Sequence, residues 1–185
     1  MFEEYPKDLV LKDGTAVTLR PLEARDADAL VTFFQRIPLA ERWYLRHDVS
    51  DAALVRHWAQ AMDYTRVIPI IALRDEQIVG DATLHRHRYG SSRSVGEIRL
   101  VIDPTVRTQR LGTWLILDII QLATRLGLEK LLAQVSSSET AALRALRHLD
   151  FMREAVVPEL HKDVDGHPYD LVIMVKHLAP AWTDF

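Results

Sequence analysis

The sequence predicts an α/β protein with a mixed β-sheet and helices on both faces. Residues 67–86 and 151–177 each contain two apolar runs joined by a turn, which is typical of hairpins. Helical patterns lie between other strands, as expected for crossover connections. The chain has 185 residues, of which 48% are hydrophobic and 26% charged. This length and composition favour one domain spanning residues 1–185.

The first half of the chain contains four predicted strands and up to three helices. Asp13-Gly14 is a turn signal, and Pro21 ends the alternating run that follows it. The expected strands are Thr15–Arg20, Val67–Leu73, Ile78–Arg86 and Val95–Ile102. The expected helices are Ala24–Arg36 and Asp51–Met62, with Leu39–His47 as a short helix or a loop.

The second half begins with the clearest helix, Arg107–Leu126, in which leucine and isoleucine recur at three- and four-residue spacing. Gly127 follows at the place of a left-handed helix cap. A buried strand, a helix and two further strands complete the order: Leu131–Val135, Glu139–Leu149, Phe151–Val157 and Leu171–His177.

Composition excludes several classes of function. The chain has no cysteine, so disulfides, thiolate metal sites and cysteine nucleophiles are impossible. The net charge of −3 gives no basic field for nucleic acid or anionic lipid, so we expect neither as a partner. The most apolar window, residues 114–123, is too short to span a bilayer, and the charged start has no signal-peptide pattern. A cytoplasmic location is therefore expected.

The stretch from Val95 to Val135 carries the chemistry. A strand leads through a tight connection into the long helix, whose first turn lies around Arg107–Thr113. The first N–H groups of a helix lack intrahelical partners and favour phosphate. Two arginines, two threonine hydroxyls and Gly112 surround this turn, which is the composition of a pyrophosphate site. An ordinary helix start with exposed arginines and one packing glycine is the alternative.

The same segment resembles the GNAT superfamily of acyl-CoA N-acetyltransferases. The family signature, Gln/Arg-x-x-Gly-x-Gly/Ala, reads here from Arg107 to Gly112, with Arg110 in place of the first glycine. The helix ending at His148-Leu149-Asp150-Phe151 resembles the family's Lys-x-Gly-Phe ending, with Asp150 for glycine. The run Glu41–Arg46 further resembles the GNAT domain of bacterial protein-lysine acetyltransferases.

The resemblance implies a mostly antiparallel sheet of six to seven strands, whose fourth and fifth strands splay apart. These would be Val95–Ile102 and Leu131–Val135. Acetyl-CoA is then the expected cosubstrate, with no metal. Its pantetheine arm would meet the backbone of Leu100, Val101 and Ile102. Its pyrophosphate would be held by Arg107, Thr108, Gln109, Arg110, Leu111, Gly112 and Thr113.

Direct acyl transfer requires a neutral amine, so a base must remove a proton. Glu97 is the candidate, since many family members carry a catalytic glutamate at this place. Glu97, Arg99 and Val101 share one face of the strand. The alternative is that Glu97 pairs with Arg99, which would lower its pKa and make it a poorer base.

The acid that protonates the leaving thiolate has no clear candidate. The family's tyrosine position falls at Leu146, which cannot donate, and Tyr89 and Tyr169 are substitutes without a geometric basis. His85 and His87 share a strand face, but no third metal ligand is evident. The resemblance thus predicts transfer to a small-molecule amine or a protein lysine, and it allows a homodimer. A degenerate domain that binds acyl-CoA without turnover is the alternative.

Overall fold

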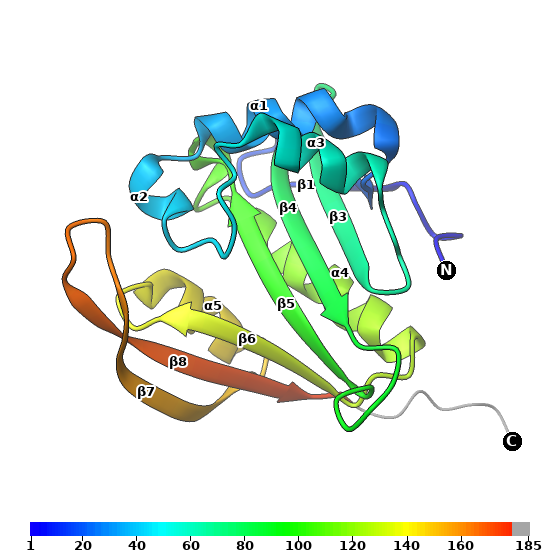
Figure 1. Cartoon of the computed structure of the whole chain (residues 1–185). Coiled ribbons are helices and arrows are strands. Elements are labelled where there is room, and N and C mark those ends of the chain that lie inside the picture. Colours follow the sequence, from blue (N-terminus) through cyan, green and yellow to red (C-terminus); the bar gives the residue numbers. More distant parts are fainter. Residues whose placement is uncertain (179–185) are drawn as a thin grey trace, which may run out of the picture. The chain divides into compact units, whose positions relative to one another are not determined.

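The computed structural model describes residues 1–178, in which eight strands form one sheet (Figure 1). The strand order is β1-β2-β3-β4-β5-β6-β8-β7. β5 and β6 are parallel, whereas β1–β2, β2–β3, β6–β8 and β7–β8 are antiparallel. The expected class, a mixed and mostly antiparallel GNAT-like sheet with helices, is confirmed. The expected count of six to seven strands is wrong by at least one.

The strands are β1 Lys7–Val10, β2 Ala16–Pro21, β3 Val67–Arg74, β4 Gln77–Arg86, β5 Val95–Ile102, β6 Lys130–Ser136, β7 Met152–Lys162 and β8 Pro168–His177. The α-helices are α1 Ala27–Arg36, α2 Leu39–Arg42, α3 Ala52–Gln60, α4 Leu111–Arg125 and α5 Thr140–His148. Two 3₁₀ turns precede α1 and α4, at Ala24–Asp26 and Pro104–Val106. No helix within residues 1–178 combines the length and apolarity that a membrane crossing requires.

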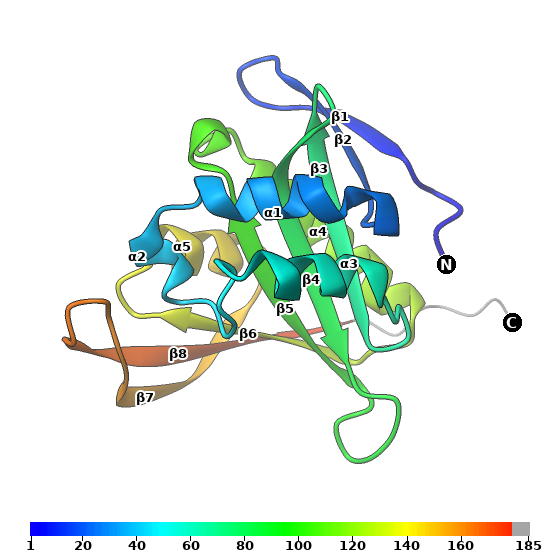
Figure 2. The same cartoon turned by 45° about the horizontal axis from the view of Figure 1, so that its top comes forward.

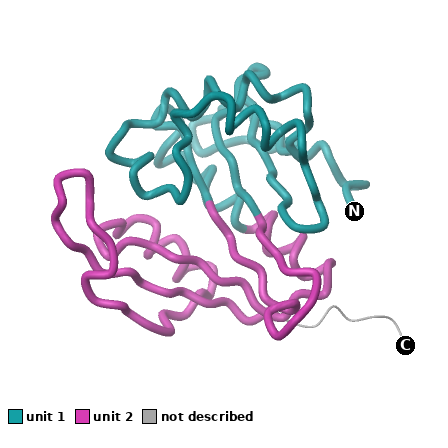
Figure 3. The backbone as a smooth tube through the Cα atoms, viewed as in Figure 1, with its two compact units in different colours: residues 1–83, 100–116 teal, residues 84–99, 117–185 magenta. Residues whose placement is uncertain are grey.

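The chain divides into two compact units (Figure 3). Unit 1 comprises residues 1–83 and 100–116, and unit 2 comprises residues 84–99 and 117–178 of the described chain. Strands β4 and β5 and helix α4 each contribute residues to both units. The prediction of one domain over residues 1–185 stays a prediction.

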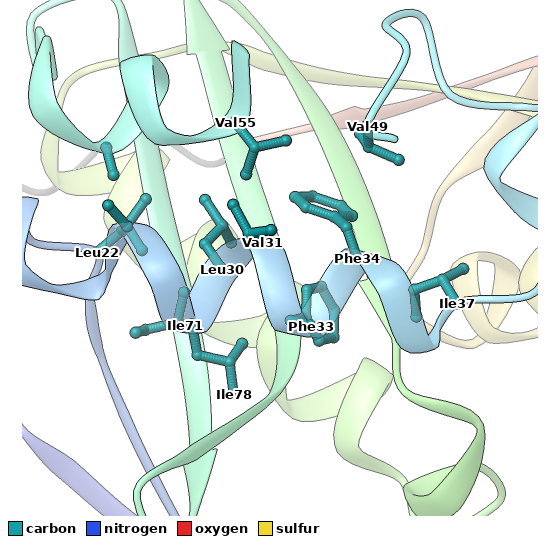
Figure 4. Close-up of a cluster of buried hydrophobic side chains, with 12 residues drawn as sticks. Leu22, Leu30, Val31, Phe33, Phe34, Ile37, Val49, Val55, Ile71 and Ile78 are labelled. Atoms are coloured by element: carbon teal, nitrogen blue, oxygen red, sulfur yellow. The ribbon is translucent and has the colours of Figure 1, made fainter. Parts of the chain in front are cut away.

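The core of unit 1 is built by α1 and α3, which lie over the same face of β3 and β4 (Figure 2). Phe33 and Phe34 of α1 and Val55 of α3 are buried there with Ile71 and Ile78 of the strands (Figure 4). Each such side chain contributes about 1.5–3 kcal/mol when it leaves water. This packing fixes α1 and α3 on the sheet.

The core of unit 2 depends on close packing around a glycine in β5. A Cβ atom on Gly96 would lie 2.7 Å from Leu84 Cδ1, 2.9 Å from Leu128 Cδ1 and 3.0 Å from Leu131 Cδ2. All three leucines are buried. Here the absence of a side chain allows three large side chains to meet above the strand.

The pairing of β5 with β6 is short. It joins Val95 to Lys130, Gly96 to Leu131 and Glu97 to Leu132, while β6 pairs with β8 along its whole length. Residues 98–102 of β5 therefore lie outside the β5–β6 ladder. The strands expected as the family's fourth and fifth are β5 and β6 here, because β1 precedes them.

Strands β1 and β7 and helix α4 differ from the sequence-based expectations. β1 was not expected, because it has only four residues and its outward positions are exposed. β7 continues past Val157 to Lys162, although Pro158 interrupts the alternating pattern. α4 begins at Leu111 instead of Arg107. Thr108 and Arg110 have φ of 62° and 68°, which a right-handed helix cannot accommodate.

Candidate active site

The connection from β5 to α4 is anchored by Asp103, a carboxylate that is 2% exposed. Its Oδ1 accepts from Thr105 N at 2.9 Å and Thr105 Oγ1 at 2.7 Å, which caps the 3₁₀ turn. Its Oδ2 accepts from Arg36 Nε of α1 at 2.7 Å. Burial opposes ionisation, but the bonds from Thr105 and Arg36 outweigh it and hold the pKa of Asp103 below its usual value. The start of the loop is thereby fixed to unit 1.

Arg107, the leading basic residue of the signature, is engaged by α2. Its Nη1 donates to Glu41 Oε1 at 2.8 Å, its Nη2 donates to Glu41 Oε2, and Nη2 also donates to the Ile102 carbonyl at 3.2 Å. Both side chains of this pair are about 40% exposed. An anion that bound Arg107 would compete with Glu41 for the guanidinium.

Two residues of the loop adopt the left-handed conformation that favours glycine, Thr108 and Arg110. Arg110 occupies the place of the family's first glycine. The backbone at this position therefore still has the left-handed conformation that favours glycine. Between them, the Gln109 carbonyl accepts from Lys12 N at 3.3 Å, which ties the loop to the segment between β1 and β2.

The first N–H groups of α4 lack acceptors within the helix. The Trp114 N–H donates to the Arg110 carbonyl at 3.1 Å. The N–H groups of Leu111, Gly112 and Thr113 precede that bond and have no acceptor within the helix. Together with the exposed Arg110 guanidinium they form a positive helix end that suits a phosphate.

Gly112 has a packing role in the structure. A Cβ atom there would lie 3.3 Å from Leu100 Cδ2 and 3.8 Å from Ile102 Cγ1, so the glycine lets α4 approach β5. The side chains of Leu100 and Ile102 face α4. Val101, between them, packs against the α1–α3 core on the other face. All ten residues expected to contact acetyl-CoA belong to unit 1.

Glu97, the expected base, belongs to unit 2 and is the last β5 residue paired with β6. Its Oε1 accepts from Arg99 Nε at 3.1 Å, and its side chain is 22% exposed. The ion pair that the sequence left as an alternative is therefore formed.

The candidates for a general acid lie in unit 2. Leu146, at the family's tyrosine position, is buried in α5. Tyr89 is 87% exposed in the loop after β4, and the Tyr169 ring lies 5.7 Å from the His161 ring between β8 and β7.

Residues 163–166 form the turn that joins β7 to β8. Asp163 Oδ1 accepts from Asp165 N at 2.9 Å and His167 N at 2.8 Å, which closes the β7–β8 hairpin. Asp163, Asp165 and His167 also form the one group of three potential metal ligands within residues 1–178. The turn geometry accounts for their proximity.

The sequence analysis missed one functional candidate, Asp81 of β4. The residue is 9% exposed, and burial raises its pKa to about 7. The signal was available, because Asp81 is the one carboxylate in the apolar run Ile78–Leu84. Buried carboxylates are rare unless paired, so such a position is a candidate for chemistry.

Comparison with known proteins identifies the family. The family model described as an acetyltransferase (GNAT) domain matches residues 16–152. The chain therefore belongs to the GNAT acetyltransferases. No curated protein matches the sequence significantly.

Solved structures share the fold at low identity. A GNAT-family acetyltransferase from Streptococcus pneumoniae has a TM-score of 0.77 at 22% identity, over 87% of this chain and 99% of that one. yncA from Salmonella typhimurium, described as an acetyltransferase and solved with its cofactor acetyl-CoA, has a TM-score of 0.75 at 21% identity, over 90% and 96%. The ribosomal-protein-alanine N-acetyltransferase of Brucella melitensis has a TM-score of 0.74 at 20% identity, over 86% and 99%.

Proposed function

We propose that the protein transfers the acetyl group of acetyl-CoA to a primary amine by direct attack in a ternary complex. The observation that carries this proposal is the β5–α4 connection. It combines the positive N-terminus of α4 with the exposed arginines Arg107 and Arg110. It follows strand β5, whose pairing with β6 ends at Glu97. Membership of the GNAT family and the acetyl-CoA bound to yncA support the choice of cosubstrate.

The loop and the strand have separate roles in this mechanism. The N–H groups of residues 111–113 and the side chains of residues 107–110 and 113 hold the pyrophosphate. The backbone of residues 100–102 holds the pantetheine arm, and N–H groups there polarise the thioester carbonyl. The amine nitrogen attacks the carbonyl carbon, the C–S bond breaks, and CoA leaves as a thiolate that takes up a proton.

Glu97, or a water that it orients, removes the proton from the amine. A lysine-like amine is mostly protonated near neutral pH, so the reaction needs such an acceptor. The ion pair with Arg99 fixes the position of the Glu97 carboxylate. We expect the released proton to pass to solvent.

The acceptor is a small-molecule amine or an amine on a protein. The Brucella relative is a ribosomal-protein-alanine N-acetyltransferase, so related structures include enzymes with protein acceptors. A homodimer and a cytoplasmic location remain predictions from the sequence.

Turnover with an amine panel tests the proposal. Free CoA thiol is measured with acetyl-CoA plus small amines or lysine peptides, and mass spectrometry identifies the acetylated product. Glu97→Gln should lower kcat by about 10²–10⁴-fold while acetyl-CoA binding is retained. Glu154→Gln, an exposed glutamate of β7, serves as the matched control. Equal activity of Glu97→Gln and wild type across pH would exclude Glu97 as the base.

A domain that binds acyl-CoA without turnover is the second candidate. The buried Leu146 at the family's tyrosine position and the Glu97–Arg99 pair favour it. Acetyl-CoA binding with no thiol release for any amine would support this candidate over transfer.

A further inference from the structure

Glu97 shares one face of the sheet in unit 2 with residues of the neighbouring strands. Glu97 pairs with Leu132 of β6, and Leu132 pairs in turn with Val175 of β8. Paired residues of neighbouring strands point to the same side of a sheet, whereas successive residues of one strand alternate. The next pair along follows this rule, since a Cβ atom on Gly96 would lie 3.0 Å from Cδ2 of its partner Leu131.

The two sides of this part of the sheet differ in burial. On the side of Leu131, the residues of β6 and β8 are at most 6% exposed: Leu131, Ala133, Val135, Val172 and Met174. The other side is accessible, and we call it the Glu97 face: Glu97, the half-buried Leu132, Ile173 and Val175, and the exposed Gln134. It ends at the paired residues Ser136 and Leu171, which are buried.

The charges on the Glu97 face are mostly positive. Among the described strands β5, β6 and β8, Glu97 is the one carboxylate on this side, because Asp170 of β8 points to the other side. Two cations lie with it. Arg99 binds Glu97 at 3.1 Å, and the exposed Lys130 precedes Leu132 by two residues. A second cation on an acceptor would therefore meet positive charge on these strands and no further carboxylate.

The base determines where the amine of the acceptor lies. Its nitrogen must come within hydrogen-bond reach of the Glu97 carboxylate or of a water bound to it. The adjoining atoms of the acceptor then lie over Leu132 and Val175, which are apolar. Met152 of β7 pairs with Val175, is 64% exposed and extends this apolar row. Because strands lie about 4.8 Å apart, the row from Glu97 to Met152 is about 14 Å long.

We propose that the acceptor carries its primary amine on an apolar chain without a second cation, and that this chain lies on the Glu97 face. The inference rests on the proposed function, because it assigns the acceptor class of the same reaction. Removal of apolar surface from water favours such a chain. A second ammonium group would lose hydration there without gaining a counterion. A free alkylamine and a lysine side chain with apolar neighbours share this chemistry.

A matched pair of amines tests the acceptor class. n-Hexylamine and cadaverine have the same number of heavy atoms and differ at the far end, which is a methyl group in one and an ammonium group in the other. Release of CoA thiol at saturating acetyl-CoA gives kcat/KM for each. We expect n-hexylamine to be used about tenfold better or more. From n-propylamine to n-hexylamine, each added CH₂ group should raise kcat/KM by about two- to fourfold.

Gln134→Glu supplies the carboxylate that the far end of the chain lacks. Gln134 is exposed and follows Leu132 by two residues, about 7 Å along β6, so the fold should be kept. This variant should raise kcat/KM for cadaverine by about fivefold, the effect of a partly exposed ion pair, without a gain for n-hexylamine. Gln121→Glu, at an exposed glutamine of α4, adds the same charge elsewhere and is the matched control.

Val175→Thr keeps the shape of the side chain and adds a hydroxyl to the apolar row. It should lower kcat/KM for n-hexylamine by about threefold or more while the affinity for acetyl-CoA is unchanged. Val156→Thr makes the same change in β7 on the opposite side of the sheet, since Val156 pairs with the buried Val172. This control should use n-hexylamine like the wild type.

The outcomes separate this inference from the proposed function. Transfer to both amines with equal kcat/KM, a wild-type preference for cadaverine, or equal effects of Gln134→Glu and Gln121→Glu would overturn the inference alone. Transfer to no amine would overturn the proposed function and the inference with it. A terminally blocked peptide with one lysine between two leucines distinguishes the sources of the chain. Faster transfer to this peptide than to n-hexylamine indicates a lysine side chain, and slower transfer indicates a free alkylamine.

Discussion

Among single residues, Arg107 illustrates how the unliganded loop is held. Its guanidinium is shared between the Glu41 carboxylate of α2 and the Ile102 carbonyl of β5. Both partners belong to unit 1, so the loop has a defined conformation before any ligand binds. The same contacts mean that a pyrophosphate must displace Glu41 to use Arg107 fully.

Glu41→Gln should strengthen acetyl-CoA binding. A partly exposed ion pair contributes up to about 1 kcal/mol, which corresponds to a gain in affinity of up to about fivefold. Isothermal titration calorimetry measures the dissociation constant directly. Arg107→Ala is the matched control and should weaken binding by at least tenfold. Weaker binding by Glu41→Gln would show instead that Glu41 positions Arg107 for the phosphate.

Asp81 makes the stability of the protein depend on pH in an unusual direction. Its folded pKa of about 7 exceeds the usual value of 3.8, so the folded state binds a proton more tightly than the unfolded chain. The stability associated with that proton is complete below pH 3.8 and is lost as the pH rises to about 7. Asp103 affects stability in the opposite direction. Its pKa is lowered in the folded protein, so the stability that its carboxylate contributes is lost only as the pH falls into the acid range.

Asp81→Asn should therefore stabilise the protein increasingly between pH 4 and about pH 7, and by a constant amount above. A difference in pKa of this size corresponds to about 4 kcal/mol at most. Thermal unfolding of both proteins at several pH values measures the effect. A difference that does not change with pH would mean that the carboxyl ionises normally in the folded protein.

At the level of elements, the junction of β5 and α4 explains the family's preference for glycine. The turn before α4 requires a left-handed residue at position 110, where this chain has arginine with φ of 68°. A left-handed conformation costs a residue with a Cβ roughly 1–2 kcal/mol, and glycine avoids that cost.

Arg110→Gly should raise the free energy of unfolding by about 1 kcal/mol, after allowance for the greater freedom of glycine in the unfolded chain. Arg110→Ala keeps the Cβ and should show no such gain, so denaturant unfolding of the two variants separates backbone strain from loss of charge. Equal stability of the two variants would contradict the account of this turn.

Strand β5 depends on Gly96 in a different way, through packing. Gly96→Ala would place a Cβ 2.7 Å from Leu84 Cδ1, with two more leucines within 3.0 Å. Overpacking of this kind costs about 1–3 kcal/mol. Leu84→Val should partly rescue the alanine variant in a double-mutant cycle measured by denaturant unfolding. Additive effects would show that Leu84 does not cause the strain.

For the whole molecule, the sequence predicted most elements because periodicity is strong where burial is strong. The long apolar stripe of α4 and the buried runs of β3 to β6 are of this kind. β1 and the second half of β7 were missed, since both are exposed and their alternation carries no burial signal.

The candidate site was predictable only where its residues lie close together in the sequence. Arg107–Thr113 is a local motif that one stretch of sequence contains. The pairing of Arg107 with Glu41 joins residues 66 positions apart, and the pairing of Arg36 with Asp103 joins residues 67 apart. Contacts at that separation depend on the tertiary fold, which no local pattern encodes. Asp81 was missed although it is the one carboxylate in the apolar run Ile78–Leu84.

The central claim is that the β5–α4 loop of this GNAT acetyltransferase binds acetyl-CoA, and thermal unfolding tests it most directly. Acetyl-CoA at 100 times its dissociation constant should stabilise the protein by about 2.7 kcal/mol and raise Tm by about 2–4 °C or more. Adenosine should give no comparable shift, and Arg107→Ala should reduce the shift with acetyl-CoA. A folded wild-type protein whose Tm does not change with acetyl-CoA would contradict the account.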